Sequence, residues 1–143
     1  MIRGAFGAAG EQSPATLRAE YEALLADAVE TVGIEQASEE TGLDGERLQQ
    51  LLDGGSPTLT LTEAAAILAL DDERPPADAV EAEARDILLM GMSTAVLDVE
   101  ALAAGIDDAM EPKEIQQKVE GRHPLTLGEY ATLHQYIENR KGA

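Results

Sequence analysis

The amino-acid sequence predicts an all-α fold built from two related helical units in tandem. Apolar residues recur at three- and four-residue spacing through most of the 143-residue chain, and no segment alternates polar and apolar residues as a strand would. A repeated phrase gives the tandem arrangement. Residues 49–63 and 116–129 share, in order, two glutamines, a glycine, a proline, Leu-Thr-Leu and a glutamate. A repeat of this kind indicates one supersecondary unit used twice.

The first unit is expected over residues 13–72, after a flexible glycine- and alanine-rich segment at residues 1–12. Ser13 is a predicted N-cap with Pro14 at the first helical position. Apolar residues at helical spacing then continue to Gly33, where the helix should end. The first unit therefore begins with a long helix.

Three shorter helices complete the first unit. Two of them are predicted at about residues 34–41 and 45–53, with a glycine turn between them. Thr60 and Glu63 have the spacing of a capping box, which opens a helix to about Leu70.

The second unit is expected over residues 73–143, after the charged and proline-marked connector at residues 71–76. The predicted helices repeat the order of the first unit, at about residues 77–97, 99–104, 112–120 and 127–139. The turn between the two short helices is about two residues longer than its counterpart. Thr126 and Glu129 form a second capping box at the start of the last helix.

Neither unit is large enough to bury its apolar face alone, so the two are expected to pack through their long helices. Leu24, Val32, Leu88 and Val96 should then lie in shared or adjoining cores. Met90 is interpreted as core filler, because flexible methionines fill irregular gaps between helices.

Composition indicates a folded protein adapted to very high salt. Twenty-eight acidic residues face ten basic ones, which gives a net charge of −18, and such a surface stays hydrated in concentrated salt. The absence of cysteine excludes disulfides and thiolate metal sites and favours a cytoplasmic location. The longest apolar stretch, residues 87–97, is too short to cross a bilayer, so no membrane contact is expected.

Stability is expected to depend steeply on salt. Residues 1–110 hold 23 acidic residues and five basic ones, whereas residues 111–143 are neutral. Salt screens the repulsion among these carboxylates, so the midpoint of thermal unfolding should rise steeply between about 0.1 and 3 M KCl. A series of melts with a constant midpoint would contradict the prediction of salt adaptation.

Both units resemble the Cro/repressor-type helix-turn-helix module, in which two short helices meet at a tight glycine turn and Pro-x-Leu-Thr precedes another helix. The residues that carry the resemblance are Ile34, Ala37, Gly42, Leu43, Leu48, Leu51, Leu52, Gly54, Pro57 and Leu59 in the first unit, and Val99, Leu102, Ile115, Val119, Gly121, Pro124 and Leu125 in the second. The whole chain also resembles a small haloarchaeal family of unknown function, through Leu-Leu-Met-Gly-Met at residues 88–92. That second resemblance implies no activity.

The helix-turn-helix resemblance implies DNA binding, because the second short helix of such modules enters the major groove. In the second unit Ile115 and Val119 define the inward face, so Gln117 should point most directly outward. Gln can read adenine, and Lys can reach guanine or phosphate. The candidate nucleic-acid-binding residues are Lys113, Gln116, Gln117, Lys118, Arg122 and His123. In the first unit Glu46 and Asp53 would repel phosphate, so that unit is a scaffold or a protein-binding surface.

The sequence therefore predicts a DNA-binding transcriptional regulator that acts through its second unit. The alternative is a non-catalytic protein-interaction module that has the same fold and binds no DNA, with a partner on the acidic first unit. An enzyme is not expected, since the sequence lacks a phosphate-binding glycine loop, a nucleophile motif and a Cys/His pair. No cofactor or metal is predicted either, and both histidines, His123 and His134, are assigned to the surface. The oligomeric state stays open.

Overall fold

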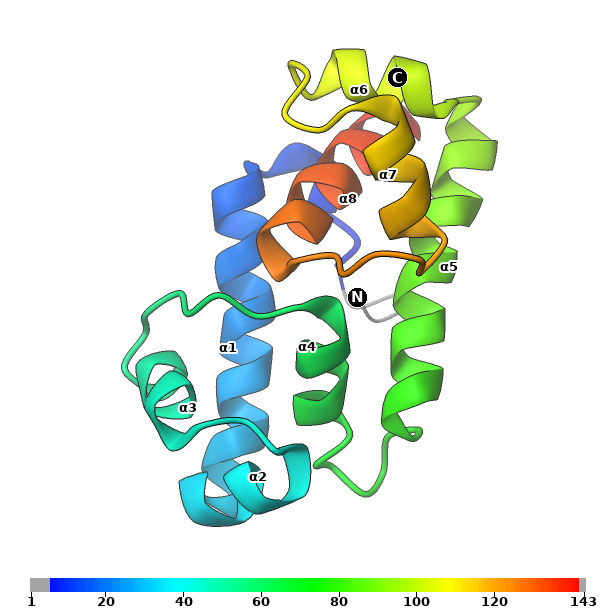
Figure 1. Cartoon of the computed structure of the whole chain (residues 1–143). Coiled ribbons are helices and arrows are strands. Elements are labelled where there is room, and N and C mark those ends of the chain that lie inside the picture. The colour runs from blue at the N-terminus through cyan, green and yellow to red at the C-terminus, as the bar shows by residue number, and fades with distance from the viewer. Residues whose placement is uncertain (1–5, 142–143) are drawn as a thin grey trace.

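The computed structural model describes residues 6–141, and in this range the protein is all-α, as predicted (Figure 1). A short 3-10 helix, η1, and eight α-helices follow one another along the chain. They are η1 (Ala9–Glu11), α1 (Pro14–Val32), α2 (Ile34–Thr41), α3 (Gly45–Leu52), α4 (Leu61–Leu68), α5 (Ala77–Ala95), α6 (Val99–Gly105), α7 (Pro112–Val119) and α8 (Leu127–Lys141). The predicted α-helices all form, with ends within about two residues of those expected.

Local capping explains why the helix ends could be predicted. The Ser13 hydroxyl accepts from the N–H of Thr16 at the start of α1, and Gly33 ends that helix with a positive φ of 89°. Thr60 and Glu63 form the predicted capping box of α4. These interactions involve residues close in sequence, so the sequence pattern specifies them directly.

The segment before α1 is packed where the structure describes it. Residues 1–5 of the predicted flexible segment lie outside the described residues, but Ala9 is fully buried and η1 packs on α8. The side-chain amide of Asn139 donates to the Gly10 carbonyl at 3.0 Å. A Cβ at Gly10 would lie 2.6 Å from the backbone nitrogen of Asn139, so only glycine allows this approach. Residues 6–12 therefore pack against α8, and their predicted flexibility stays a prediction.

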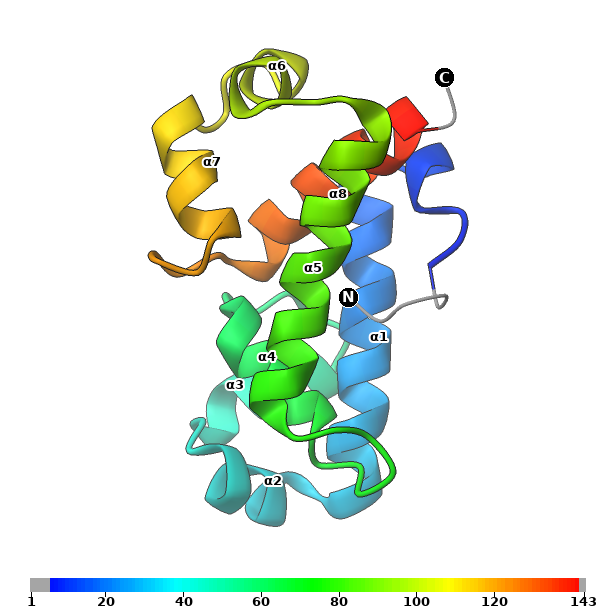
Figure 2. The same cartoon turned by 90° about the vertical axis from the view of Figure 1, so that its right-hand side faces the viewer.

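The two halves of the chain interlock through their fourth helices. In Figure 1, α4 and α8 lie between the long helices α1 and α5, and Figure 2 shows the same stack turned by 90°. Helix α4 of the first half packs against α5, and α8 of the second half packs against α1. The predicted packing through the long helices is thus mediated by α4 and α8, and one continuous core crosses the predicted boundary between residues 72 and 73.

The repeated Leu-Thr-Leu segments pair with each other in the structure. The N–H of Leu61 donates to the carbonyl of Leu125 at 2.7 Å, and the N–H of Leu127 donates to the carbonyl of Leu59 at 2.8 Å. The two threonines between these leucines form an isolated antiparallel bridge. Each copy of the repeat therefore binds the other in the same way, although the superposition of the two halves stays a prediction.

Core assignments made from the sequence hold on α1 but fail at the end of α5. Leu88 is fully buried, and Leu24 and Val32 are partly buried against the core. Val96, however, is 88% exposed, and Met90 is 53% exposed. Val96 is exposed because α5 ends at Ala95, where Val96 takes a left-handed conformation with φ of 55° and turns the chain away from the core. Met90 lies within α5, on a face that is turned to solvent.

Within the described residues, no single helix is long and apolar enough to span a membrane. Helices α5 and α6 together have the length and composition of a membrane-spanning segment, but they are bent by 94° relative to each other.

Candidate nucleic-acid interface

Helices α6 and α7 form the pair that sequence analysis assigned to DNA. Six residues, 106–111, join them, against three residues, 42–44, between α2 and α3. The connection is therefore three residues longer than its counterpart, rather than two. Asp107 and Asp108 both have φ of 57°, a left-handed conformation that aspartate tolerates better than most residues. These two residues reverse the chain between the helices.

The outward face of α7 is rotated from the predicted one. Ile115 and Val119 are buried as expected, but Gln117 is half-buried, whereas Gln116 is exposed. The loop after α7 folds back onto the helix: the N–H groups of Arg122 and His123 both donate to the Gln117 carbonyl, at 2.8 and 3.3 Å. Gln116, rather than Gln117, is therefore the glutamine that this helix presents most openly to solvent.

Lys118 forms an ion-pair clamp that joins α7 to α8. Its ammonium lies 2.8 Å from a carboxylate oxygen of Glu114 and 2.5 Å from one of Glu129, and its side chain is only 15% exposed. Burial alone would lower the pKa of Lys118, but the hydrogen bonds to both glutamates outweigh it and raise that pKa. Two carboxylates already neutralise this charge, and the assignment of Lys118 to phosphate or base contact stays a prediction.

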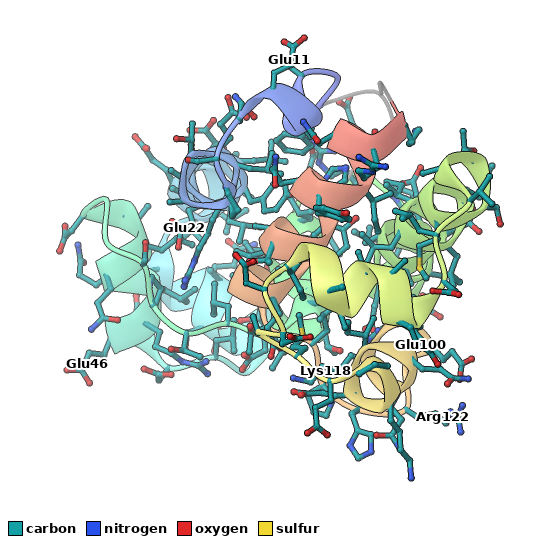
Figure 3. The ribbon with its side chains drawn as sticks, turned by 90° about the horizontal axis from the view of Figure 1, so that it is seen from above. Glu11, Glu22, Glu46, Glu100, Lys118 and Arg122 are labelled. Carbon is teal, nitrogen blue, oxygen red and sulfur yellow. The ribbon has the colours of Figure 1, made fainter. Side chains whose placement is uncertain are left out.

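The remaining candidates are exposed, and one of them is also paired. The Arg122 guanidinium donates to the Glu120 carboxylate, and this hydrogen bond lowers the pKa of Glu120. Lys113 and His123 are exposed, and no carboxylate within the described residues forms an ion pair with Lys113. Figure 3 shows Arg122 on one side of the molecule and Glu46 of the first half on the other.

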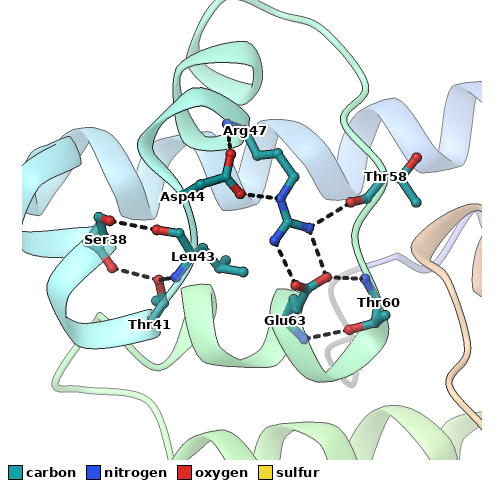
Figure 4. Close-up of polar contacts among 9 residues, drawn as sticks. Ser38, Thr41, Leu43, Asp44, Arg47, Thr58, Thr60 and Glu63 are labelled. Atoms are coloured by element: carbon teal, nitrogen blue, oxygen red, sulfur yellow. Dashed lines mark hydrogen bonds and ion pairs between the residues drawn. The ribbon is translucent and has the colours of Figure 1, made fainter.

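The first half also has an ion-pair clamp, formed by Arg47 on α3 (Figure 4). Arg47 on α3 lies 2.6 Å from Asp44 and 2.9 Å from Glu63, and its guanidinium also donates to the Thr58 carbonyl at 3.0 Å. The hydrogen bond to Glu63 is the largest of the effects that raise the pKa of Arg47. Arg47 and Lys118 thus each bind the capping-box glutamate of their own half. Sequence analysis missed both clamps, because the partners are 16 and 11 residues apart.

Replacing Lys118 by methionine is expected to lower the free energy of unfolding by about 0.5–1.5 kcal/mol, because Glu129 loses its charged partner at the start of α8. Lys113→Met on the same helix is the matched control and should change stability by less than about 0.5 kcal/mol. Urea unfolding at one fixed salt concentration measures both. Equal losses for the two variants would argue against the clamp.

The histidines differ from each other in burial. His123 is exposed, as predicted, but His134 is only 4% exposed and is hydrogen-bonded through Nδ1 to the Tyr21 hydroxyl. Burial lowers the pKa of His134 to about 3. Its surface assignment was wrong, since this position on α8 faces α1. Within the described residues, no group of three or more His, Cys, Asp or Glu side chains could hold a metal ion.

A second surface, the corner patch, consists of Leu89, Met90 and Val96 where α5 meets α6. These three are the large apolar side chains that the described part of the chain leaves exposed. An open hollow of about 500 Å³ is lined by two of them, Leu89 and Val96, together with Met92, Ser93, Leu97 and Asp98. Sequence analysis missed the patch, because the apolar spacing of α5 continues through Val96 as if that residue were still part of a buried helical face.

The chain is thus an all-α protein whose described residues leave an apolar corner exposed to solvent. The chain belongs to the DUF5791 family, a family of unknown function whose model matches residues 17–140. No curated protein and no solved structure matches the chain.

Proposed function

We propose that the protein is a non-catalytic interaction module that binds another protein through the corner patch. The observation that carries this proposal is the left-handed and exposed conformation of Val96. A left-handed conformation costs an ordinary residue about 1–2 kcal/mol, and for a β-branched side chain it is a true outlier. With its side chain 88% exposed, Val96 recovers little of this cost by packing. Strain of this kind persists mainly where a residue serves a function.

The first half of the chain provides an internal comparison. Helices α1 and α5 both have 19 residues, so Gly33 and Val96 occupy the same position after each helix. Gly33 meets the positive φ without strain. Counting back from the two helix ends, Ala26 and Asp27 stand where the second half has Leu89 and Met90. The exposed apolar side chains are therefore particular to the second half.

The charge of the predicted DNA surface also favours a protein partner. Lys118 and Arg122, two of the cations assigned to DNA, are bound to glutamates of the same half. On α3, the exposed side chains include Glu46, which would face phosphate with like charge. We retain the helix-turn-helix resemblance as a description of the α2–α3 and α6–α7 pairs, and salt adaptation as the reason for the net charge of −18.

Val96→Gly tests the proposal, because it separates stability from binding. Glycine relieves the left-handed strain, so this variant should be as stable as the wild type or more stable. The variant should also fail to bind a protein that the wild-type chain retains from a lysate of its source cells. Binding measurements with that protein in purified form should give the same difference between variant and wild type. Glu46→Gln, exposed on α3 and outside the lining of the hollow, is the control. Capture of no protein by the wild type, or undiminished binding by Val96→Gly, would reject the proposal.

DNA binding through α7 is the second candidate function. One observation favours it: Lys113 and Gln116 are exposed together on α7, with Arg122 and His123 in the loop that follows. At molar salt the Debye length is about 3 Å, so distant carboxylates would repel DNA little. Lys113→Glu should then weaken binding to all sequences, and Gln116→Ala should weaken it at one base pair, whereas Gln50→Ala should have no effect. Absence of DNA binding by the wild type at every salt concentration would exclude this candidate.

A further inference from the structure

We infer that the partner at the corner patch is a basic amphipathic helix of another protein, an inference that rests on the proposed function. The hollow between the end of α5 and the start of α6 is lined mainly by apolar side chains. Leu89, Val96 and Leu97 line it together with Met92, so an apolar side chain entering it would meet apolar atoms of α5 and of the connection to α6. An open hollow of this size can take large apolar side chains from one face of a helix, which are the anchors in helix-in-groove recognition.

The acidic residues at and beside the hollow favour a positively charged partner, since Asp98 lines it and Glu100 follows at the start of α6. Residues 77–111 hold nine acidic residues and one basic residue, Arg85. Arg85 is bound to Glu81 and to the backbone carbonyl of Lys118, and its side chain is largely buried, so its charge is already paired. Lysines or arginines on either side of an apolar face would complement this surface, and glutamates would be repelled.

Asp98 joins the apolar and charged parts of the site. It lines the hollow, and one of its carboxylate oxygens caps α6 by accepting from the N–H of Ala101 at 2.8 Å. Within the described residues, its other oxygen has no hydrogen-bond donor. Glu100, exposed two residues further on (Figure 3), adds a second negative charge at the start of α6. A cation beside the inserted apolar residue would therefore meet Asp98 first.

Other occupants fit this surface less well. A second copy of the chain would bring the same acidic residues and another net charge of −18 to the contact. An anionic membrane would be repelled for the same reason. A β-strand partner needs an unpaired strand edge, and the backbone groups within α5 and α6 are already hydrogen-bonded inside the helices. A helix with basic flanks satisfies both the apolar and the charged requirement.

Three labelled synthetic peptides test the inference against the full-length chain by fluorescence anisotropy. The first is a helix with leucines along one face and lysines elsewhere, and the second carries glutamates in place of the lysines. The third has the composition of the first in scrambled order, so that it keeps the charge and loses the apolar face. The first peptide should bind about ten-fold more tightly than either of the others.

Two variants assign that binding to the corner patch. Val96→Gly should weaken binding of the first peptide by about ten-fold at all salt concentrations. Asp98→Asn retains a good helix cap and removes the charge, so it should weaken binding about three-fold at low salt and less at molar salt. Glu46→Gln, an equally exposed acid on α3, is the control and should leave binding unchanged.

The outcomes separate this inference from the proposed function. Equal binding of the scrambled peptide would show non-specific attraction and overturn the inference, and so would equal binding of the glutamate peptide. If no peptide binds while a cellular protein still depends on Val96, the partner class is wrong and the proposed function stands. If neither depends on Val96, both fail. A dimer in sedimentation that Val96→Gly dissociates would assign the patch to self-association and overturn the inference.

Discussion

Replacing Leu88 by alanine is expected to lower the free energy of unfolding by about 2–5 kcal/mol. Leu88 is fully buried in the middle of the core, on the helix that contacts both α4 and α8. Truncating it removes apolar burial and leaves a cavity where the two halves of the chain meet. Since small proteins are stable by only about 5–15 kcal/mol, this loss could unfold much of the population.

The neighbouring residue is the matched control for this substitution. Leu89 is 43% exposed, so Leu89→Ala should cost less than about 1 kcal/mol. Urea unfolding of both variants at the same salt concentration measures the difference. Equal losses would mean that the inward face of α5 has been assigned wrongly, and that the corner patch is part of the core.

Acidification is expected to destabilise the protein through His134. The pKa of this buried imidazole is about 3 in the folded chain and about 6.5 in the unfolded chain. Between these values the unfolded chain binds one proton more, so the stability falls as the pH falls from about 6.5 to 3. The slope from this one group is at most about 1.4 kcal/mol per pH unit.

A double variant isolates this contribution from that of the carboxylates. His134→Leu combined with Tyr21→Phe removes both members of the buried hydrogen bond, so it leaves no unpaired polar group. Its free energy of unfolding should fall less steeply than that of the wild type between about pH 6.5 and 5, where most carboxylates stay ionised. Identical slopes in urea unfolding would show that His134 is not held neutral.

Positions of helices could be predicted from this sequence more fully than contacts between them. Caps such as Ser13 and the Thr60–Glu63 box depend on neighbours in sequence, and they set the helix ends correctly. The packing of α8 against α1 joins residues more than a hundred positions apart, and no local pattern specifies it. For the same reason the burial of His134 against Tyr21 could not be predicted.

At the candidate site, too, the sequence predicted which side chains face inward but not their contacts with residues on other elements. Helical periodicity placed Ile115 and Val119 inward correctly, because their burial follows from the helix itself. It could not show that Lys118 reaches Glu129 on another helix, or that the following loop folds over Gln117. Val96 was misplaced because a continuous apolar spacing does not reveal where a helix stops when no glycine or proline marks its end.

The exchange of fourth helices between the halves affects how a ribosome-bound chain can reach this fold. When residues 1–76 have been synthesised, α4 exists without α5, and α1 exists without α8. Helix α4 gains its partner when α5 emerges, but the face of α1 that contacts α8 stays open until α8 is released. We expect the chain to gain its stability late in synthesis and in one step, and to depend until then on chaperones that protect exposed apolar surface.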